Sequence, residues 1–154
     1  MGKIFRFLVT HAIALAVGFA LGVYFLPILT EPPGPDASEL EAMAAEAQYQ
    51  ATLKRDLRGS DFAHWGEGTI SVSAAQISHQ GKLAPGPDYK LYLTKGLVDH
   101  EDTFDRANAV RIGDVKTFSG CILDVPSDID VAAYDSILVW CEAFGEFITA
   151  ASYK

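Results

Sequence analysis

The two cysteines of this sequence, Cys121 and Cys141, are the residues with the clearest chemistry, because thiols can pair, carry electrons or act as nucleophiles. Both fall in apolar, β-prone stretches on either side of a connection that covers residues 124–135. If those two stretches pair as antiparallel strands, the two cysteines can face each other. Outside the cytoplasm such a pair would oxidise, and closing a loop of about 20 residues would stabilise the fold by about 3 kcal/mol. A structural disulfide is therefore the first interpretation.

Two other interpretations of the cysteines stay open. A reversible redox disulfide requires a strained or exposed bond, which raises its reduction potential. Alternatively the thiols are separate, with Cys141 either inert in the core or reactive by itself. The apolar neighbours Ile137, Val139 and Phe144 favour burial of Cys141, and burial raises the pKa of a thiol and lowers its reactivity.

Other residue types that could perform chemistry form no recognisable site. His64, His79 and His100 are not spaced with another histidine or cysteine as zinc ligands are. The acidic loop at residues 99–102 lacks an ordered calcium-loop pattern, and no nucleophile elbow or phosphate loop is present in the sequence. We therefore expect no metal and no cofactor, and we expect a non-enzymatic domain rather than an enzyme.

The N-terminal segment is predicted to be an apolar helix that positions the rest of the chain. Residues 7–29 carry no Asp, Glu, Lys or Arg, and 23 helical residues span about 34 Å, enough for a bilayer core of about 30 Å. Lys3 and Arg6 precede the segment, whereas Glu31 and Asp36 follow it. The positive-inside rule predicts a single-pass anchor with a cytoplasmic N-terminus and a domain in the periplasm or extracellular space.

A cleaved signal peptide is the alternative, since residues 20–22 form a small-x-small pattern that a peptidase could accept. The apolar run continues to residue 29, which favours an uncleaved anchor. Gly18 and Gly22 form a GxxxG step, a spacing that allows a weak homodimer through the helix.

The net charge of −8 excludes nucleic acid as an expected partner, because phosphate binding requires clustered basic residues. An acidic domain on a tether would instead suit a basic protein partner. A proline-rich segment at residues 31–36 favours an extended spacer, and a helix is predicted from a Ser38–Glu41 capping box to about Leu57. The predicted division is an anchor at 1–30, a linker with a helical stalk at 31–57, and a domain at 58–154.

From residue 58 onward the pattern is that of an all-β domain. Short runs rich in β-branched and aromatic residues alternate with glycine, proline and aspartate. The predicted strands cover residues 69–73, 76–83, 89–94, 110–112, 116–123, 136–144 and 146–152. This number of short strands predicts a β-sandwich or a Greek-key barrel.

Several segments, in order, resemble the DM-thirteen domain family. The first is GPDYKLYL at residues 86–93, followed by Val125-Pro126 and by YDSILVWC at residues 134–141, with Phe144 and Ala150 after it. The resemblance covers about residues 62–153.

The resemblance implies an all-β domain, often secreted or membrane-tethered, that occurs beside DOMON modules and b-type cytochromes. It further implies electron transfer with a protein redox partner, in which Cys141, with Trp140 beside it, is the suspected redox group. Cys121 is not part of the family pattern. Two functions follow as expectations: a redox module that uses Cys141, with or without Cys121, and a non-catalytic binding or structural domain stapled by a Cys121–Cys141 disulfide.

Overall fold

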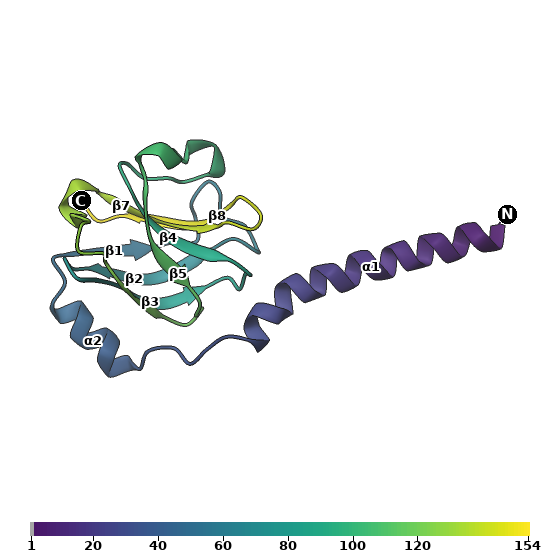
Figure 1. Ribbon diagram of the computed structural model, residues 1–154, viewed down its shortest axis with the longest axis horizontal. Coiled ribbons are helices and arrows are strands. Elements are labelled where there is room, and N and C mark those ends of the chain that lie inside the picture. The colour runs from purple at the N-terminus through teal and green to yellow at the C-terminus, as the bar shows by residue number, and fades with distance from the viewer. Residues whose placement is uncertain (1) are drawn as a thin grey trace.

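Two four-stranded antiparallel sheets face each other in the computed structural model, which describes residues 2–154 (Figure 1). One sheet has the strand order β1-β2-β3-β6 and the other has the order β5-β4-β7-β8. The strands are β1 (Tyr49–Leu53), β2 (Gly66–Val72), β3 (Gln76–Leu83), β4 (Tyr89–Thr94), β5 (Val110–Val115), β6 (Cys121–Asp124), β7 (Ser136–Cys141) and β8 (Glu146–Ser152). The predicted all-β class and the β-sandwich are confirmed.

Apolar side chains from the inner faces of both sheets form the main core. Ile70 and Ile77 contribute from the first sheet, and Leu93, Ile137 and Ile148 contribute from the second. All five are at most 1% exposed. Burying a side chain of this size stabilises a fold by about 1.5–3 kcal/mol, so this layer holds the two sheets together.

Strand β7 is buried on both faces, which explains its uninterrupted apolar sequence. Ile137, Val139 and Cys141 point into the core between the sheets. Leu138 and Trp140 belong to a second apolar cluster on the other side of the sheet. The loop that covers this cluster contains the short 3-10 helices η1 (Glu101–Thr103) and η2 (Arg106–Asn108), and a third, η3 (Val131–Ala133), precedes β7.

The N-terminal helix α1 (Gly2–Leu29) extends away from the domain (Figure 1). It is long and apolar enough to cross a membrane, and none of its apolar window is buried against the domain. A single membrane span and a signal sequence both meet these criteria.

The predicted helix from Ser38 to Leu57 is wrong beyond Ala45. Helix α2 covers Ala37–Ala45, and Tyr49–Leu53 forms β1, which pairs with β2. The capping box is made by Asp36 and Glu39 instead of Ser38 and Glu41. Tertiary pairing overrides local helix propensity here, because Ala51 and Leu53 are buried in the core as members of β1. Helix α2 lies on β3 with Leu40 buried.

Candidate functional site

Cys141 is the last residue of β7 and lies where the strand enters the turn to β8. Its partners across the sheet are Tyr89 on β4 and Glu146 on β8. The residue is only 3% exposed. Because strand alternation directs its side chain between the sheets, the thiol lies at one open end of the sandwich rather than on an outer face.

A largely apolar groove of about 420 Å³ opens at this end of the sandwich, and Cys141 contributes to its lining. The domain supplies two short segments and several single side chains, and the C-terminal half of α1 supplies the opposite wall. The lining residues are Phe19, Ala20, Val23, Tyr24, Ala63, His64, Pro85, Gly86, Pro87, Tyr89, Cys141, Phe144, Glu146 and Ile148. The groove therefore combines a thiol, two phenols, an imidazole and a carboxylate with apolar walls.

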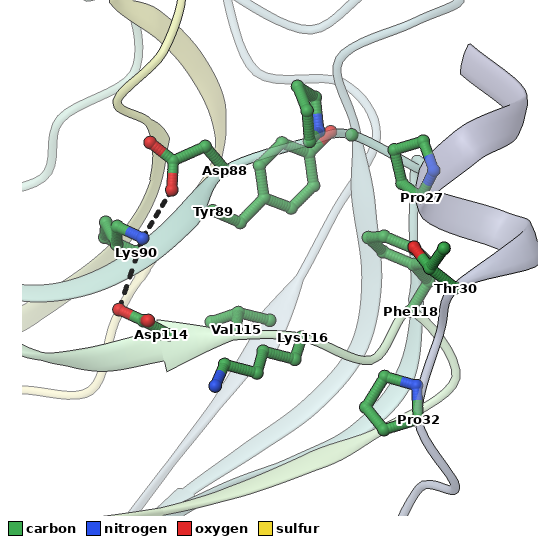
Figure 2. Close-up of a pocket in the computed structure, with 12 residues that line it drawn as sticks. Pro27, Thr30, Pro32, Asp88, Tyr89, Lys90, Asp114, Val115, Lys116 and Phe118 are labelled. Atoms are coloured by element: carbon green, nitrogen blue, oxygen red, sulfur yellow. Dashed lines mark hydrogen bonds and ion pairs between the residues drawn. The ribbon is translucent and has the colours of Figure 1, made fainter. Parts of the chain in front are cut away.

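A more polar pocket lies beside the groove, between the end of α1 and the start of β4 (Figure 2). Lys90 bridges Asp88 and Asp114 there, with Nζ–Oδ1 distances of 2.5 and 3.2 Å. These two carboxylates raise the pKa of Lys90, with Asp88 the stronger contributor. Gly86, Pro87 and Tyr89 contribute to the lining of both the pocket and the groove.

The electrostatic surroundings of Cys141 act in two directions. Burial is the largest effect and raises the pKa of the thiol. Backbone hydrogen bonding at Phe144, Asp88 and Ala143 lowers it and offsets part of the effect of burial. At neutral pH the group is a thiol, and amide groups surround the position where negative charge would develop on the sulfur.

The predicted Cys121–Cys141 disulfide is wrong in this structure, where both cysteines are free and buried. Cys121 begins β6, which pairs with β3 in the first sheet, whereas β7 pairs with β4 and β8 in the second. The connection between them crosses from one sheet to the other and does not form a hairpin. The antiparallel pairing that would have brought the cysteines together therefore does not exist.

Cys121 is buried to nearly the same extent as Cys141, at 5% against 3% exposed. Burial raises its pKa to about 11, although hydrogen bonding to the backbone of His79 lowers it slightly. His79 lies directly across the sheet from it. Cys121 does not contribute to the lining of the groove.

Trp140 lies on the opposite face of the sheet from Cys141. Its ring packs on Phe104 with centroids 4.7 Å apart, and the Arg106 guanidinium carbon lies 5.4 Å from its centroid. Its indole Nε1 is buried without a hydrogen-bond partner among residues 2–154. Although Trp140 and Cys141 are adjacent in sequence, they do not share a surface.

A polar cluster beside Trp140 has no counterpart in the sequence-based prediction. The Arg106 Nη1 atom donates to both carboxylate oxygens of Glu142, at 2.9 and 3.0 Å, and the Tyr92 hydroxyl donates to the same carboxylate. Arg106 accordingly lowers the pKa of Glu142, and burial together with Glu142 raises that of Tyr92. Arg106 and Glu142 are 36 residues apart, and no local pattern links them.

His79 is a buried histidine that the sequence does not distinguish from the two less buried histidines of the domain. It is 1% exposed, its Nε2 donates to the carbonyl of Glu67 at 3.0 Å, and its Nδ1 has no partner in the described part of the chain. Burial lowers the pKa of the imidazole. The ring is therefore neutral in the folded protein at neutral pH.

This shift predicts a pH-dependent stability. Because the pKa of His79 is lower in the folded state, the unfolded state binds the proton more readily, and stability falls as the pH drops below about 6.5. The slope for one group is at most about 1.4 kcal/mol per pH unit. Urea unfolding between pH 7 and pH 5 should show this loss for the wild type and not for His79→Gln. An equal slope in both proteins would contradict the assignment.

Comparison with known proteins yields one match. The family model described as electron transfer DM13 matches residues 57–153, which is more than half of the chain and contains the whole groove-forming part of the domain. The match confirms the resemblance found in the sequence. No curated protein and no solved structure gives a significant match.

Proposed function

Because this chain belongs to the electron transfer DM13 family, we propose that it is a membrane-tethered electron-transfer domain in which Cys141 is the redox group. The observation that carries the proposal is the position of the thiol. Cys141 lines an open groove at one end of the sandwich, whereas Cys121 does not. Trp140 packs on the other face of the sheet and supports β7 without reaching the groove.

The redox step that suits a single thiol is exchange with a disulfide of a partner protein. Cys141 loses its proton, and its sulfur attacks one sulfur of the partner disulfide. A new S–S bond joins Cys141 to that sulfur, the old S–S bond breaks, and the departing sulfur takes up a proton. The partner disulfide is the oxidant, and Cys141 is oxidised to the mixed disulfide.

The amide groups around Cys141 assist this step. Hydrogen bonding at Ala143 and Phe144 favours negative charge on the sulfur, and burial opposes it. Burial keeps Cys141 protonated and shielded from oxidants when no partner is bound. The thiolate becomes accessible when a partner occupies the groove and removes the proton.

The apolar helix α1 supports the tether. Lys3 and Arg6 at its start favour a cytoplasmic N-terminus, and a domain in the periplasm or extracellular space is part of the proposal. A Cβ atom added at Gly18 or Gly22 would meet no atom of residues 2–154 within 4 Å other than those of its own helix turn, so this face of the helix is open to a second helix. A weak homodimer through these glycines is part of the proposal.

A non-catalytic binding or structural domain is the second candidate. It is favoured by the burial of both thiols, which are 5% and 3% exposed for Cys121 and Cys141. In that case the groove would bind a ligand without any change at sulfur.

A redox titration of the full chain in nanodiscs separates the two candidates. The protein is equilibrated with reduced and oxidised glutathione, and mass spectrometry of the digested protein locates the modified cysteine. We expect one glutathione at Cys141 and none at Cys121. If both thiols stay unmodified in the folded protein and react only in denaturant, the electron-transfer proposal fails and the binding domain replaces it.

A further inference from the structure

Exposed aromatic side chains gather at the end of the domain that carries the groove. Three large apolar residues of the domain are exposed: Phe62 (95%), Phe144 (50%) and Leu97 (44%). Phe144 lines the groove, and Phe62 directly precedes the lining residue Ala63. Leu97 follows the far end of β4. We define the groove edge as residues 62–64, residues 85–87 and Phe144.

The groove edge lies beside the C-terminal half of α1. Four residues of α1, from Phe19 to Tyr24, form one wall of the groove. The helix has 28 residues and is about 42 Å long, which exceeds a hydrocarbon core of about 30 Å. If the core begins just after Arg6, about 20 residues reach Leu26, and Tyr24 lies near the outer boundary, where tyrosine is favoured.

The chain between α1 and α2 holds the domain in this position. The Phe118 backbone N–H donates to the Glu31 carboxylate at 2.7 Å, and Gly34 approaches the backbone of Gly120. Pro27, Thr30 and Pro32 surround the pocket that also contains Tyr89 and Phe118 (Figure 2). The linker is therefore attached to the domain surface at Glu31 and at Gly34 and does not act as a free spacer.

We propose that the groove edge rests on the bilayer, with Phe62 and Phe144 inserted at the outer boundary and lipid acyl chains filling the groove. The proposal rests on α1 being a membrane anchor, as proposed above. The occupant is lipid because one wall of the groove is the membrane-spanning helix itself, so the groove continues directly into the hydrocarbon layer. Cys141 then opens towards the membrane, and its redox partner must present its disulfide at the bilayer surface and displace lipid from the groove to reach the thiol.

The charges of the groove edge are compatible with this contact. Asp61 accepts from His64, with 3.1 Å between Oδ2 and Nδ1, and Asp88 pairs with Lys90. Glu146 lies at the groove wall, where the ammonium group of a zwitterionic headgroup can approach it. Pairing of the nearby carboxylates reduces the cost of bringing this edge to the headgroup layer.

Quenching by brominated lipid tests the proposal. Phe62→Trp, Phe144→Trp and Leu97→Trp variants of the full chain are reconstituted in phosphatidylcholine vesicles, with and without bromine near the top of the acyl chains. Trp65 and Trp140 are present in every variant, and their emission is subtracted with the wild type. We expect the added emission of Phe62→Trp and Phe144→Trp to be strongly quenched by brominated lipid, and that of Leu97→Trp to be unaffected.

Three results would overturn the proposal. Equal, weak quenching at all three positions would show that the groove edge faces water. Emission at Phe144→Trp that responds to the protein-to-lipid ratio, and not to bromine, would show that a second copy covers the edge. Loss of the protein from the vesicles in an alkaline wash would refute the anchor on which the contact depends. Since none of these readouts uses Cys141, an unreactive thiol would refute electron transfer alone.

Discussion

Cys141→Ser is expected to remove the fast phase of the reaction of the folded protein with dithiodipyridine. The remaining reaction, at Cys121, is expected to be slower by on the order of 100-fold. Cys121→Ser is expected to leave the rate of the fast phase unchanged. The reason is the difference in surroundings: Cys141 borders the groove, whereas Cys121 has a pKa of about 11 and is enclosed by the first sheet. At neutral pH Cys121 is therefore a thiol and not a thiolate.

Absorbance of the released thiopyridone in stopped-flow mixing gives the rate for each variant of the full chain. Urea unfolding of both variants serves as the control, because a destabilised protein would expose either thiol by opening. A fast phase that survives in Cys141→Ser and disappears in Cys121→Ser would transfer the redox role to Cys121. Slow reaction in all three proteins would support the non-catalytic domain.

Most strands of the domain can be predicted from the sequence, because each has a buried inner face that imposes a local pattern. The predicted bounds of β3 and of β4 agree with those observed. Strand β1 is not predicted from the sequence. Tyr49–Leu53 follows an alanine- and glutamate-rich helix, and its strand conformation depends on pairing with β2, which is a tertiary contact. The local sequence determines the helix or strand propensity of this segment. It does not show that the segment pairs with β2 and forms the edge of the first sheet.

The candidate site can be predicted only in part, for a related reason. Cys141 is identified through the family resemblance, yet its position at a groove depends on Pro85, Tyr89 and His64, which are far from it in the chain. The disulfide prediction fails because it assumes that β6 and β7, which follow each other in sequence, are also neighbours in a sheet. In a sandwich, consecutive strands often belong to opposite sheets, and only the topology decides this.

Gly68→Ala is expected to cause the largest loss of stability, about 3 kcal/mol or more, which is a large part of the roughly 5–15 kcal/mol typical of a domain. Gly68 has φ of +115°, and a Cβ atom there would lie 2.2 Å from the carbonyl oxygen of Gln80. Its partner across the ladder is Gly81, so β2 and β3 approach each other where neither has a side chain. Both the backbone conformation and the close approach require glycine.

Gly96→Ala separates these two causes. Gly96 has φ of +95° but no atom of the described residues within 4 Å of an added Cβ, so alanine there introduces backbone strain alone, about 1–2 kcal/mol. Urea unfolding of the full chain, followed by tryptophan fluorescence, should therefore give a clearly larger loss for Gly68→Ala than for Gly96→Ala. Equal losses would mean that β2 and β3 separate at little cost. Since the ring of His79 lies over Gly81 on the same sheet, such separation would also relax the burial that lowers the pKa of His79.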